Sequence, residues 1–198
     1  MLSLVAAFAV SVPLGAGLLA LSAFFLFFFR DPDRPTPAVA GAILAPADGR
    51  VIVAGTSTSQ DFPPANWQQI SIFLSPMDVH VNRMPAEGRV VKVRYHPGRF
   101  LPAYKAEAGD LNEYTEVWLQ HGAHMIVVRQ VVGILARRIV CRVKEGSVVK
   151  PGERFGVMKF GSRMDVFLPT SAELAVHVGQ HVVGGETVLA RLEVPGAR

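Results

Sequence analysis

The first 29 residues constrain the fold more than any other part of the chain, because residues 2–29 contain no charged side chain. Leu, Val, Ala and Phe dominate this stretch. About 20 apolar residues are enough to cross the hydrocarbon core of a bilayer as a helix, so the stretch is long enough to span once with tilt. Pro13, Gly15 and Gly17 would also permit a kink or a shallow hairpin. We therefore expect residues 1–29 to form a membrane anchor, as a transmembrane or membrane-embedded helix.

A cleaved signal peptide is the alternative for this stretch. Such a peptide carries a basic region ahead of its apolar core, and no basic residue precedes Leu2. Arg30 and Arg34 follow the stretch instead. Because basic residues flanking a span stay on the cytoplasmic side, we expect a cell-membrane location with the C-terminal domain in the cytoplasm.

The charged residues all follow the apolar stretch and leave a mild basic excess. There are 20 Lys and Arg against 16 Asp and Glu, a formal net charge of +4. This balance suits an anionic membrane surface or an anionic substrate. The basic residues are scattered and form no block interleaved with aromatics, so we expect no nucleic-acid partner. The single cysteine, Cys141, excludes an intrachain disulfide and is typical of a reducing compartment.

Residues 30–40 contain three prolines and are predicted to be a linker that leaves the bilayer. After them the pattern changes to short apolar runs separated by Gly and Pro, several with the alternation of strands. These runs lie at 50–53, 69–74, 89–93 and 124–128. No long helical periodicity occurs beyond the anchor. Residues 41–198 are therefore expected to form one mostly β domain, of a barrel-sandwich type.

Two internal repeats support that architecture. The sequence Pro46-Ala47-Asp48-Gly49-Arg50-Val51 recurs as Pro85-Ala86-Glu87-Gly88-Arg89-Val90. A second, Gly-rich repeat places Gly146, Gly152 and Glu153 in the same spacing as Gly179, Gly185 and Glu186. Turn–strand units of this kind pair well as pseudo-symmetric halves of a small barrel-sandwich.

Several common catalytic patterns are missing. The chain has no Gly-rich phosphate loop before a helix, no Cys/His cluster with zinc spacing and no Gly-x-Ser-x-Gly elbow. We therefore expect no metal. His121 and His124 form a pair without an accompanying carboxylate motif and are expected to be ordinary surface or hydrogen-bonded histidines.

The dipeptide Gly161-Ser162 would usually be just a turn, but it also permits a specific reaction. A Ser hydroxyl can attack the carbonyl that precedes it in an N→O acyl shift, and Gly at that position removes a side chain that would crowd the intermediate. The shift is unfavourable, so the fold must strain the peptide and activate the hydroxyl. β-Elimination from the ester would then leave dehydroalanine, which hydrolyses to a pyruvoyl group.

A series of motifs surrounds this dipeptide in both directions. They are Phe29-Arg30-Asp31-Pro32, Pro46-Ala47-Asp48-Gly49, the segment from Leu74 to Arg83 (LSPMDVHVNR), His96-Pro97-Gly98-Arg99-Phe100, Asn112-Glu113, Gln130 with Gly133 and Ala136-Arg137-Arg138-Ile139, Phe160-Gly161-Ser162-Arg163 with Asp165 and Pro169, and Gly179-Gln180 with Val183 and Gly185-Glu186-Thr187. In this order they resemble the short, bacterial-type phosphatidylserine decarboxylase proenzymes, from position 29 to 190.

The resemblance implies a cut between Gly161 and Ser162. It would give a β chain of residues 1–161 and an α chain of residues 162–198, which remain associated. Ser162 would become a covalent pyruvoyl cofactor. Its carbonyl would form a Schiff base with phosphatidylserine in the membrane and accept electrons as CO₂ leaves, and phosphatidylethanolamine would be released. A homo-oligomer is left open.

The resemblance also implies roles for residues around Ser162. His80 and Asp48 match positions used for processing and decarboxylation, and a carboxylate from Asp48 or Asp78 would orient His80. Longer relatives have a second histidine where this chain has Arg83. We hypothesise that His80 serves both steps and that Arg83, with Asp78 nearby, binds the substrate carboxylate or phosphate.

Tyr114 is a second departure, because the family pattern has Arg after Asn-Glu. Lys105 or Arg99 could supply the lost anion contact.

Three other interpretations remain. Residues 156–160 loosely match the hairpin of biotinyl and lipoyl domains, in which Lys159 would be modified. A membrane-tethered β domain without activity is the second. A pyruvoyl decarboxylase acting on a soluble amino acid is the third, and the apolar N-terminal stretch argues against it.

Overall fold

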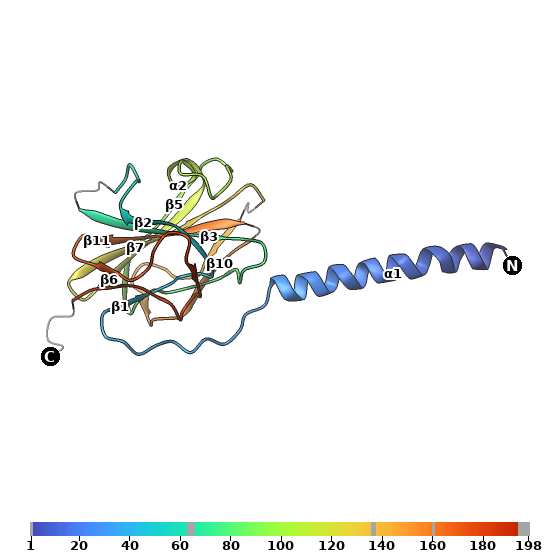
Figure 1. Ribbon diagram of the computed structural model, residues 1–198, viewed down its shortest axis with the longest axis horizontal. Helices are drawn as coiled ribbons and strands as arrows, with labels where there is room; N and C mark the ends of the chain where they lie inside the picture. The colour runs from blue at the N-terminus through green and yellow to red at the C-terminus, as the bar shows by residue number, and fades with distance from the viewer. Residues whose placement is uncertain (1, 63–65, 136–137, 160, 194–198) are drawn as a thin grey trace.

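The computed structural model describes residues 2–62, 66–135, 138–159 and 161–193, with side chains from Val12 onward. Helix α1 (Leu2–Phe28) extends away from a β domain and meets it only at its C-terminal end (Figure 1). Within the residues whose side chains are described, no helix is both long and apolar enough to cross a membrane. The sequence motifs include Ala136, Arg137 and Phe160, which lie outside the described residues.

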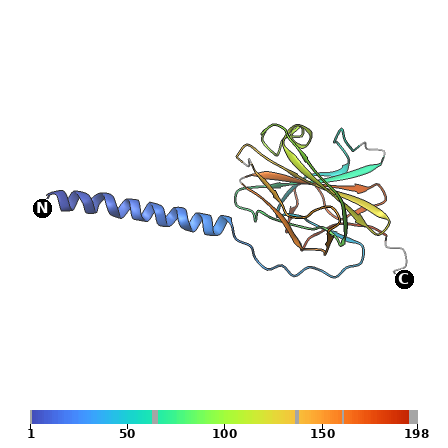
Figure 2. The same ribbon diagram turned by 180° about the vertical axis from the view of Figure 1, so that it is seen from behind.

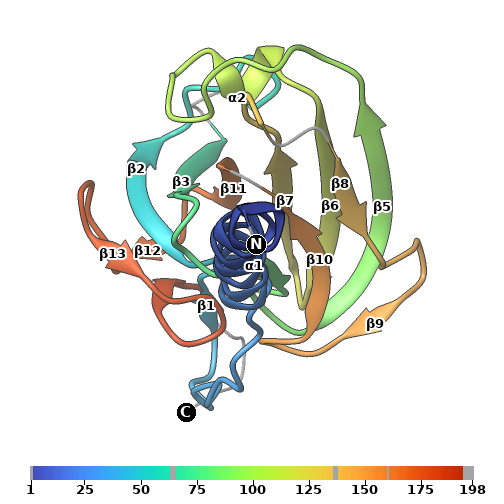
Figure 3. The ribbon, with the colours of Figure 1, turned by 90° about the vertical axis from the view of Figure 1, so that its right-hand side faces the viewer.

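A sheet of eight antiparallel strands dominates the described part of the chain and curls into a half-barrel (Figure 3). In spatial order its strands are β13 (His181–Val182), β2 (Gly49–Thr56), β3 (Trp67–Leu74), β11 (Ser162–Pro169), β7 (His124–Val131), β6 (Tyr114–His121), β5 (Gly88–His96) and β9 (Val148–Val149). The four runs predicted to be strands all lie in this sheet. The prediction of a mostly β domain is therefore confirmed.

Two small sheets cover the concave face of the half-barrel. One contains β1 (Ala42–Leu44), β14 (Val188–Arg191) and β12 (Glu173–Leu174), and the other contains β4 (Val81–Arg83), β10 (Arg154–Met158) and β8 (Ile139–Cys141). Alternate residues of β11, such as Met164 and Val166, point into the core between these layers. There they join Ile43 from β1 and Phe155 from β10, and all four are fully buried. Burial of this apolar surface holds the layers together.

The sequence repeats make equivalent hydrogen bonds in the fold. Val51 N donates to Gln180 O in one copy and Val90 N donates to Ser147 O in the other, both at 2.8 Å. The order of the large sheet is also symmetric, since β13-β2 at one edge corresponds to β9-β5 at the other. The pseudo-twofold axis therefore runs between the two central strands, β7 and β11.

The convex face of the sheet carries a second, smaller apolar cluster. Phe62, Val127 and Phe167 are buried there, with Trp67 and Trp118 packed beside them. The loop before β6, which includes the short helix α2 (Ala108–Leu111), lies at one end of this face (Figure 3). The central strands are therefore covered on both faces.

The segment between α1 and β1 runs along the outside of the domain (Figures 1 and 2). Its charged side chains bind the domain: Asp31 pairs with Arg83 at 3.0 Å and with Arg154 at 2.7 Å. Arg34 pairs with Asp48 at 2.8 Å. The predicted linker, residues 30–40, is thus a strap fastened by ion pairs rather than a free tether.

Candidate active site

Ser162 is the first residue of β11 and is fully buried. Its backbone is fixed by pairing with Leu74 of β3. Among the described residues, its Oγ has no hydrogen-bond partner. A buried hydroxyl without a partner is uncommon in folded proteins. This oxygen contributes no hydrogen bond to stability within the described residues, and its lone pairs are available for reaction.

Gly161 supplies the carbonyl next to that hydroxyl. Its φ of 72° lies in the left-handed region, where a residue with a side chain is strained. A Cβ at this position would meet no atom within 4 Å, so the reason for Gly is its backbone conformation and not crowding. The peptide that the proposed acyl shift would attack therefore has an unusual conformation.

The carbonyl of Gly161 lies directly against Gly133. A Cβ on Gly133 would clash with the Gly161 oxygen and would come within 3.3 Å of the Ala103 Cβ. The neighbouring residue, Val132, is fixed by Asn112, whose side chain donates to the Val132 carbonyl at 2.9 Å. The Asn-Glu motif and Gly133 therefore shape the position of the Gly161 carbonyl.

His80 is buried, with only 1% of its surface exposed. Among the described residues, neither ring nitrogen has a hydrogen-bond partner. Its ring packs against Phe28, the last residue of α1, with the ring centroids 4.1 Å apart. Burial lowers the pKa of His80, and Asp78 opposes this shift. The imidazole is therefore neutral at pH 7 and able to accept a proton.

The sheet brings the segments of His80 and Ser162 together. Ser162 pairs with Leu74, six residues before His80 in the chain. The carbonyl of His80 accepts from Met158 N at 3.2 Å, four residues before Ser162. The end of β10 and the start of β11 therefore lie beside the two ends of the loop that joins β3 to β4.

The two candidate carboxylates have other partners than His80. Asp48 accepts from Gly184 N and from Arg34, both at 2.8 Å. Asp78 accepts from Ser75 N at 2.8 Å and contacts the His181 ring at 3.2 Å. In this structure neither carboxylate makes the expected hydrogen bond to the imidazole.

Arg83 likewise binds other groups of the protein, so its guanidinium is not open to an anion. Its guanidinium donates to Asp31, to the Pro32 carbonyl and to the Gly152 carbonyl, at 2.9 to 3.1 Å. Only 6% of the residue is exposed. The structure therefore assigns Arg83 to the strap, and a role in substrate binding stays a prediction.

The sequence matches known proteins over most of its length. Residues 21–190 match the family model described as phosphatidylserine decarboxylase. A phosphatidylserine decarboxylase proenzyme from Prosthecochloris aestuarii is 44% identical over 183 residues, covering 92% of this chain and 84% of the relative. Proteins of the same name from Gluconobacter oxydans and Salinibacter ruber are 48% and 46% identical, covering 90% and 87% of this chain and 81% and 78% of the relatives.

The chain belongs to the phosphatidylserine decarboxylase family. It is therefore an enzyme of the carboxy-lyase class. The resemblance inferred from its motifs is confirmed.

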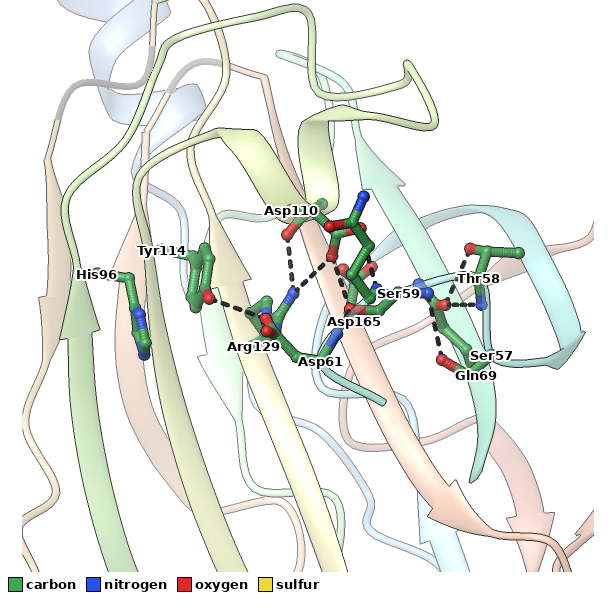
Figure 4. A network of polar contacts seen from close by, with 12 residues as sticks. Ser57, Thr58, Ser59, Asp61, Gln69, His96, Asp110, Tyr114, Arg129 and Asp165 are labelled. Carbon is green, nitrogen blue, oxygen red and sulfur yellow. Dashed lines mark hydrogen bonds and ion pairs between the residues drawn. The ribbon is translucent and has the colours of Figure 1, made fainter. Parts of the chain in front are cut away.

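In this phosphatidylserine decarboxylase family member, an ionic network centred on Arg129 lies on the convex face of the sheet, across β6, β7 and β11 (Figure 4). Arg129 is fully buried and contacts Glu116 at 2.7 Å and Asp61 at 2.9 Å. Its guanidinium lies 4.1 Å from the ring centre of Tyr114. Burial raises the pKa of Tyr114 to about 12, so its hydroxyl stays protonated and donates to Asp61.

Arg163 and Asp165 extend the network along β11. Their side chains are in contact at 2.6 Å, and Arg163 also donates to Ser71 at 3.0 Å. Tyr114 therefore stands in a structural network at the position where the family pattern has Arg. The backbones of Lys105 and Arg99 adjoin this network, because Arg163 donates to the Lys105 carbonyl and the Arg99 backbone bridges to Asn112. A contact from either side chain to an anion stays a prediction.

Sequence reasoning gave no role to Gly133, Asn82 or Gln130, although all three lie in matched motifs. Asn82 and Gln130 are fully buried and bond to each other at 2.8 Å. Gln130 is a buried polar residue on the core side of β7, where it follows the apolar residues Ile126 and Val128 of the same face. The sequence signal that could have identified Gln130 is a polar residue at a core-facing position of an alternating strand.

Proposed function

We propose that this protein converts phosphatidylserine to phosphatidylethanolamine, using a pyruvoyl group made from Ser162 by self-cleavage of the Gly161–Ser162 bond. Family membership supports the overall reaction. The observation that carries the cleavage proposal is the buried Ser162 Oγ, which has no partner among the described residues and follows a left-handed Gly161.

Self-cleavage would begin with attack of Ser162 Oγ on the Gly161 carbonyl carbon. The C–O bond forms, the C–N bond breaks, and the proton lost by the hydroxyl is balanced by the one that the freed amine gains. Loss of the Ser162 α-proton then expels the Gly161 carboxylate and leaves dehydroalanine. Water hydrolyses dehydroalanine to the pyruvoyl group and releases ammonia. Neutral His80 is the base that we assign to these proton transfers.

The residues around position 162 fit a pyruvoyl group. Conversion to this group replaces the Ser162 amine with a keto oxygen and the hydroxymethyl side chain with a methyl group. The Oγ that is removed has no partner among the described residues, so no side-chain hydrogen bond is lost. When present, it supplies a carbonyl that condenses with the substrate amine and takes up electrons as CO₂ departs. His80 would return a proton to the carbon that lost CO₂, with Asp48 supporting the site through Gly184 and Arg34.

We also propose that residues 1–29 anchor the enzyme in the cell membrane, with residues 41–198 as the catalytic domain on the cytoplasmic side. The uncharged sequence of residues 2–29 supports this. Phe28 packs on His80, so the anchor ends at the candidate site. A lipid head group could then reach the site while its acyl chains stay in the bilayer.

Intact-mass spectrometry of the purified protein tests the proposal. Wild-type protein should give two chains, 1–161 and 162–198, with a pyruvoyl group blocking the N-terminus of the smaller chain. Ser162→Ala should remain one chain without decarboxylase activity. The control Ser147→Ala changes a serine in an exposed turn and should cleave normally. A wild-type chain that remains uncut yet decarboxylates phosphatidylserine would refute the mechanism.

A further inference from the structure

Asn82 on β4 and Gln130 on β7 form a buried pair of amide side chains. Gln130 Nε2 donates to Asn82 Oδ1 at 2.8 Å and to the Val140 carbonyl at 3.3 Å. Because a carbonyl can only accept, Val140 fixes which end of the Gln130 amide points toward Asn82. The orientation of both amides follows from this contact.

Half of the hydrogen-bonding capacity of this pair is unused. Gln130 Oε1 and Asn82 Nδ2 are buried and have no partner among the described residues. Other buried amides of this fold are fully bonded: Asn112 uses its oxygen with Leu101 and its nitrogen with Leu101 and Val132. Since the fold satisfies buried amides elsewhere, the unused atoms of Asn82 and Gln130 point to a ligand.

The pair lies next to the candidate catalytic residues. Gln130 is paired with Met164 of β11, so Ser162 is its diagonal neighbour on the same face of the sheet. Asn82 is two residues beyond His80 and pairs with Gly156 of β10. A Cβ on Gly156 would lie 2.6 Å from Gln130 Nε2, so glycine is required for Gln130 to reach beneath this strand.

Four buried side chains in this region therefore have unused polar atoms: His80, Asn82, Gln130 and Ser162. The amide pair adds one acceptor and one donor without adding net charge. A zwitterionic head group matches this set, because its ammonium donates and its anionic oxygens accept. Neutral amides can bind both groups without burying an unpaired counter-charge.

We propose that Asn82 and Gln130 recognise the head group of the lipid substrate. Gln130 Oε1 accepts a hydrogen bond from the substrate amine, and Asn82 Nδ2 donates to an anionic oxygen of the carboxylate or the phosphodiester. This assignment rests on the proposed decarboxylase function and names substrate-positioning residues for it.

The test measures head-group binding separately from turnover. Processed enzyme is treated with borohydride, which reduces a pyruvoyl group to a lactoyl group and prevents reaction with the amine. Binding of glycerophosphoserine is then measured by calorimetry. Asn82→Asp keeps the oxygen that accepts from Gln130 but replaces the donor with an acceptor. Gln130→Met removes the acceptor at similar volume. Each should weaken binding on the order of 10- to 100-fold.

Glycerophosphoethanolamine, which lacks the carboxylate, identifies the oxygen that Asn82 binds. A loss for both ligands in Asn82→Asp assigns the phosphodiester, and a loss for glycerophosphoserine alone assigns the carboxylate. Gln69→Met is the control, because Gln69 is an equally buried glutamine bonded to Thr58 and Ser71 away from this site. It should lose stability but bind both ligands normally.

The inference would be overturned if both folded site variants bound the ligands with wild-type affinity. It would also be overturned if the Gln69→Met control lost as much affinity as the site variants. If Asn82→Asp does not fold, Gln130→Met alone decides. The proposed function is judged separately, by whether wild-type protein yields two chains and decarboxylates phosphatidylserine. A cleaved, active wild type with unaffected variants would refute only the role of the amide pair.

Discussion

At the scale of single residues, the close contact between Gly133 and the Gly161 carbonyl leads to a prediction about self-cleavage. Gly133→Ala places a methyl group where that oxygen now lies, so the carbonyl must move relative to Ser162 Oγ. We expect cleavage to slow by roughly tenfold or more, since small displacements of reacting atoms are costly. Gel analysis of the uncut fraction over time measures this.

Gly122→Ala is the matched control for Gly133→Ala. Gly122 has a φ of 56° in the turn between β6 and β7, and a Cβ there would meet no atom within 4 Å. This variant should lose about 1–2 kcal/mol of stability, because Ala is strained in the left-handed region, and should cleave at the wild-type rate. Normal cleavage by a folded Gly133→Ala variant would show that the contact has no role in processing.

His80 gives a second prediction at this scale, through its lowered pKa. The unfolded chain protonates this histidine near its ordinary pKa of 6.5, whereas the folded protein resists protonation. The stabilising effect of the neutral buried ring is therefore complete above about pH 6.5 and decreases as the pH falls below that value. Urea unfolding of the uncut Ser162→Ala protein between pH 5 and 8 measures it.

Replacing the imidazole removes this contribution. His80→Gln in the same Ser162→Ala background should show a flatter dependence of unfolding free energy on pH over this range. Identical slopes with and without the imidazole would contradict a lowered pKa for His80.

At the scale of elements, the strap should be fastened mainly by Asp31. Asp31 contacts both Arg83 and Arg154, whereas Asp33 reaches only Arg154, at 3.4 Å, and is fully exposed. We expect Asp31→Ala to speed tryptic cleavage after Arg30 by roughly 3- to 10-fold, because opening of the strap costs less. Asp33→Ala should change that rate little. Equal rates for both variants would mean that these ion pairs do not hold the strap.

The strap also shows what the sequence could and could not predict. Its three prolines are typical of a segment without regular structure, and residues 30–40 contain no helix or strand. Its attachment could not be predicted, because Arg83, Arg154 and Asp48 are distant in sequence and meet it only through the folded sheets. For the same reason the pairing of Arg83 with Asp31 could not be predicted from the sequence. A role for Arg83 in substrate binding stays a prediction.

Predictions from the sequence were more successful where the pattern is local. Alternating apolar runs predicted four strands of the large sheet, and the two repeats matched the two edges of that sheet. Ser162 was singled out by the ordered motifs on both sides of Gly161-Ser162, and its catalytic role stays a prediction. Gln130 received no role, because its unused acceptor depends on the positions of Val140 and Asn82 in other strands.

At the scale of the whole molecule, cleavage would fall in the centre of the sheet. The chain from residue 162 onward supplies β11, which pairs with β3 on one side and β7 on the other. We therefore expect the two cleaved chains to elute together in size-exclusion chromatography without denaturant and to separate only in urea. Elution of residues 162–198 alone under native conditions would contradict this.

The central place of β11 has a further consequence once the backbone is cut. Folding of the uncut proenzyme is unimolecular, whereas reassembly of the mature enzyme requires two separate polypeptides to meet. Its recovery after denaturation would therefore depend on protein concentration, and the smaller chain would carry only a few strands with which to find its place. The fold would thus form once, as a single chain, before maturation. After cleavage it would be difficult to re-form at the low concentration that one protein has in a cell.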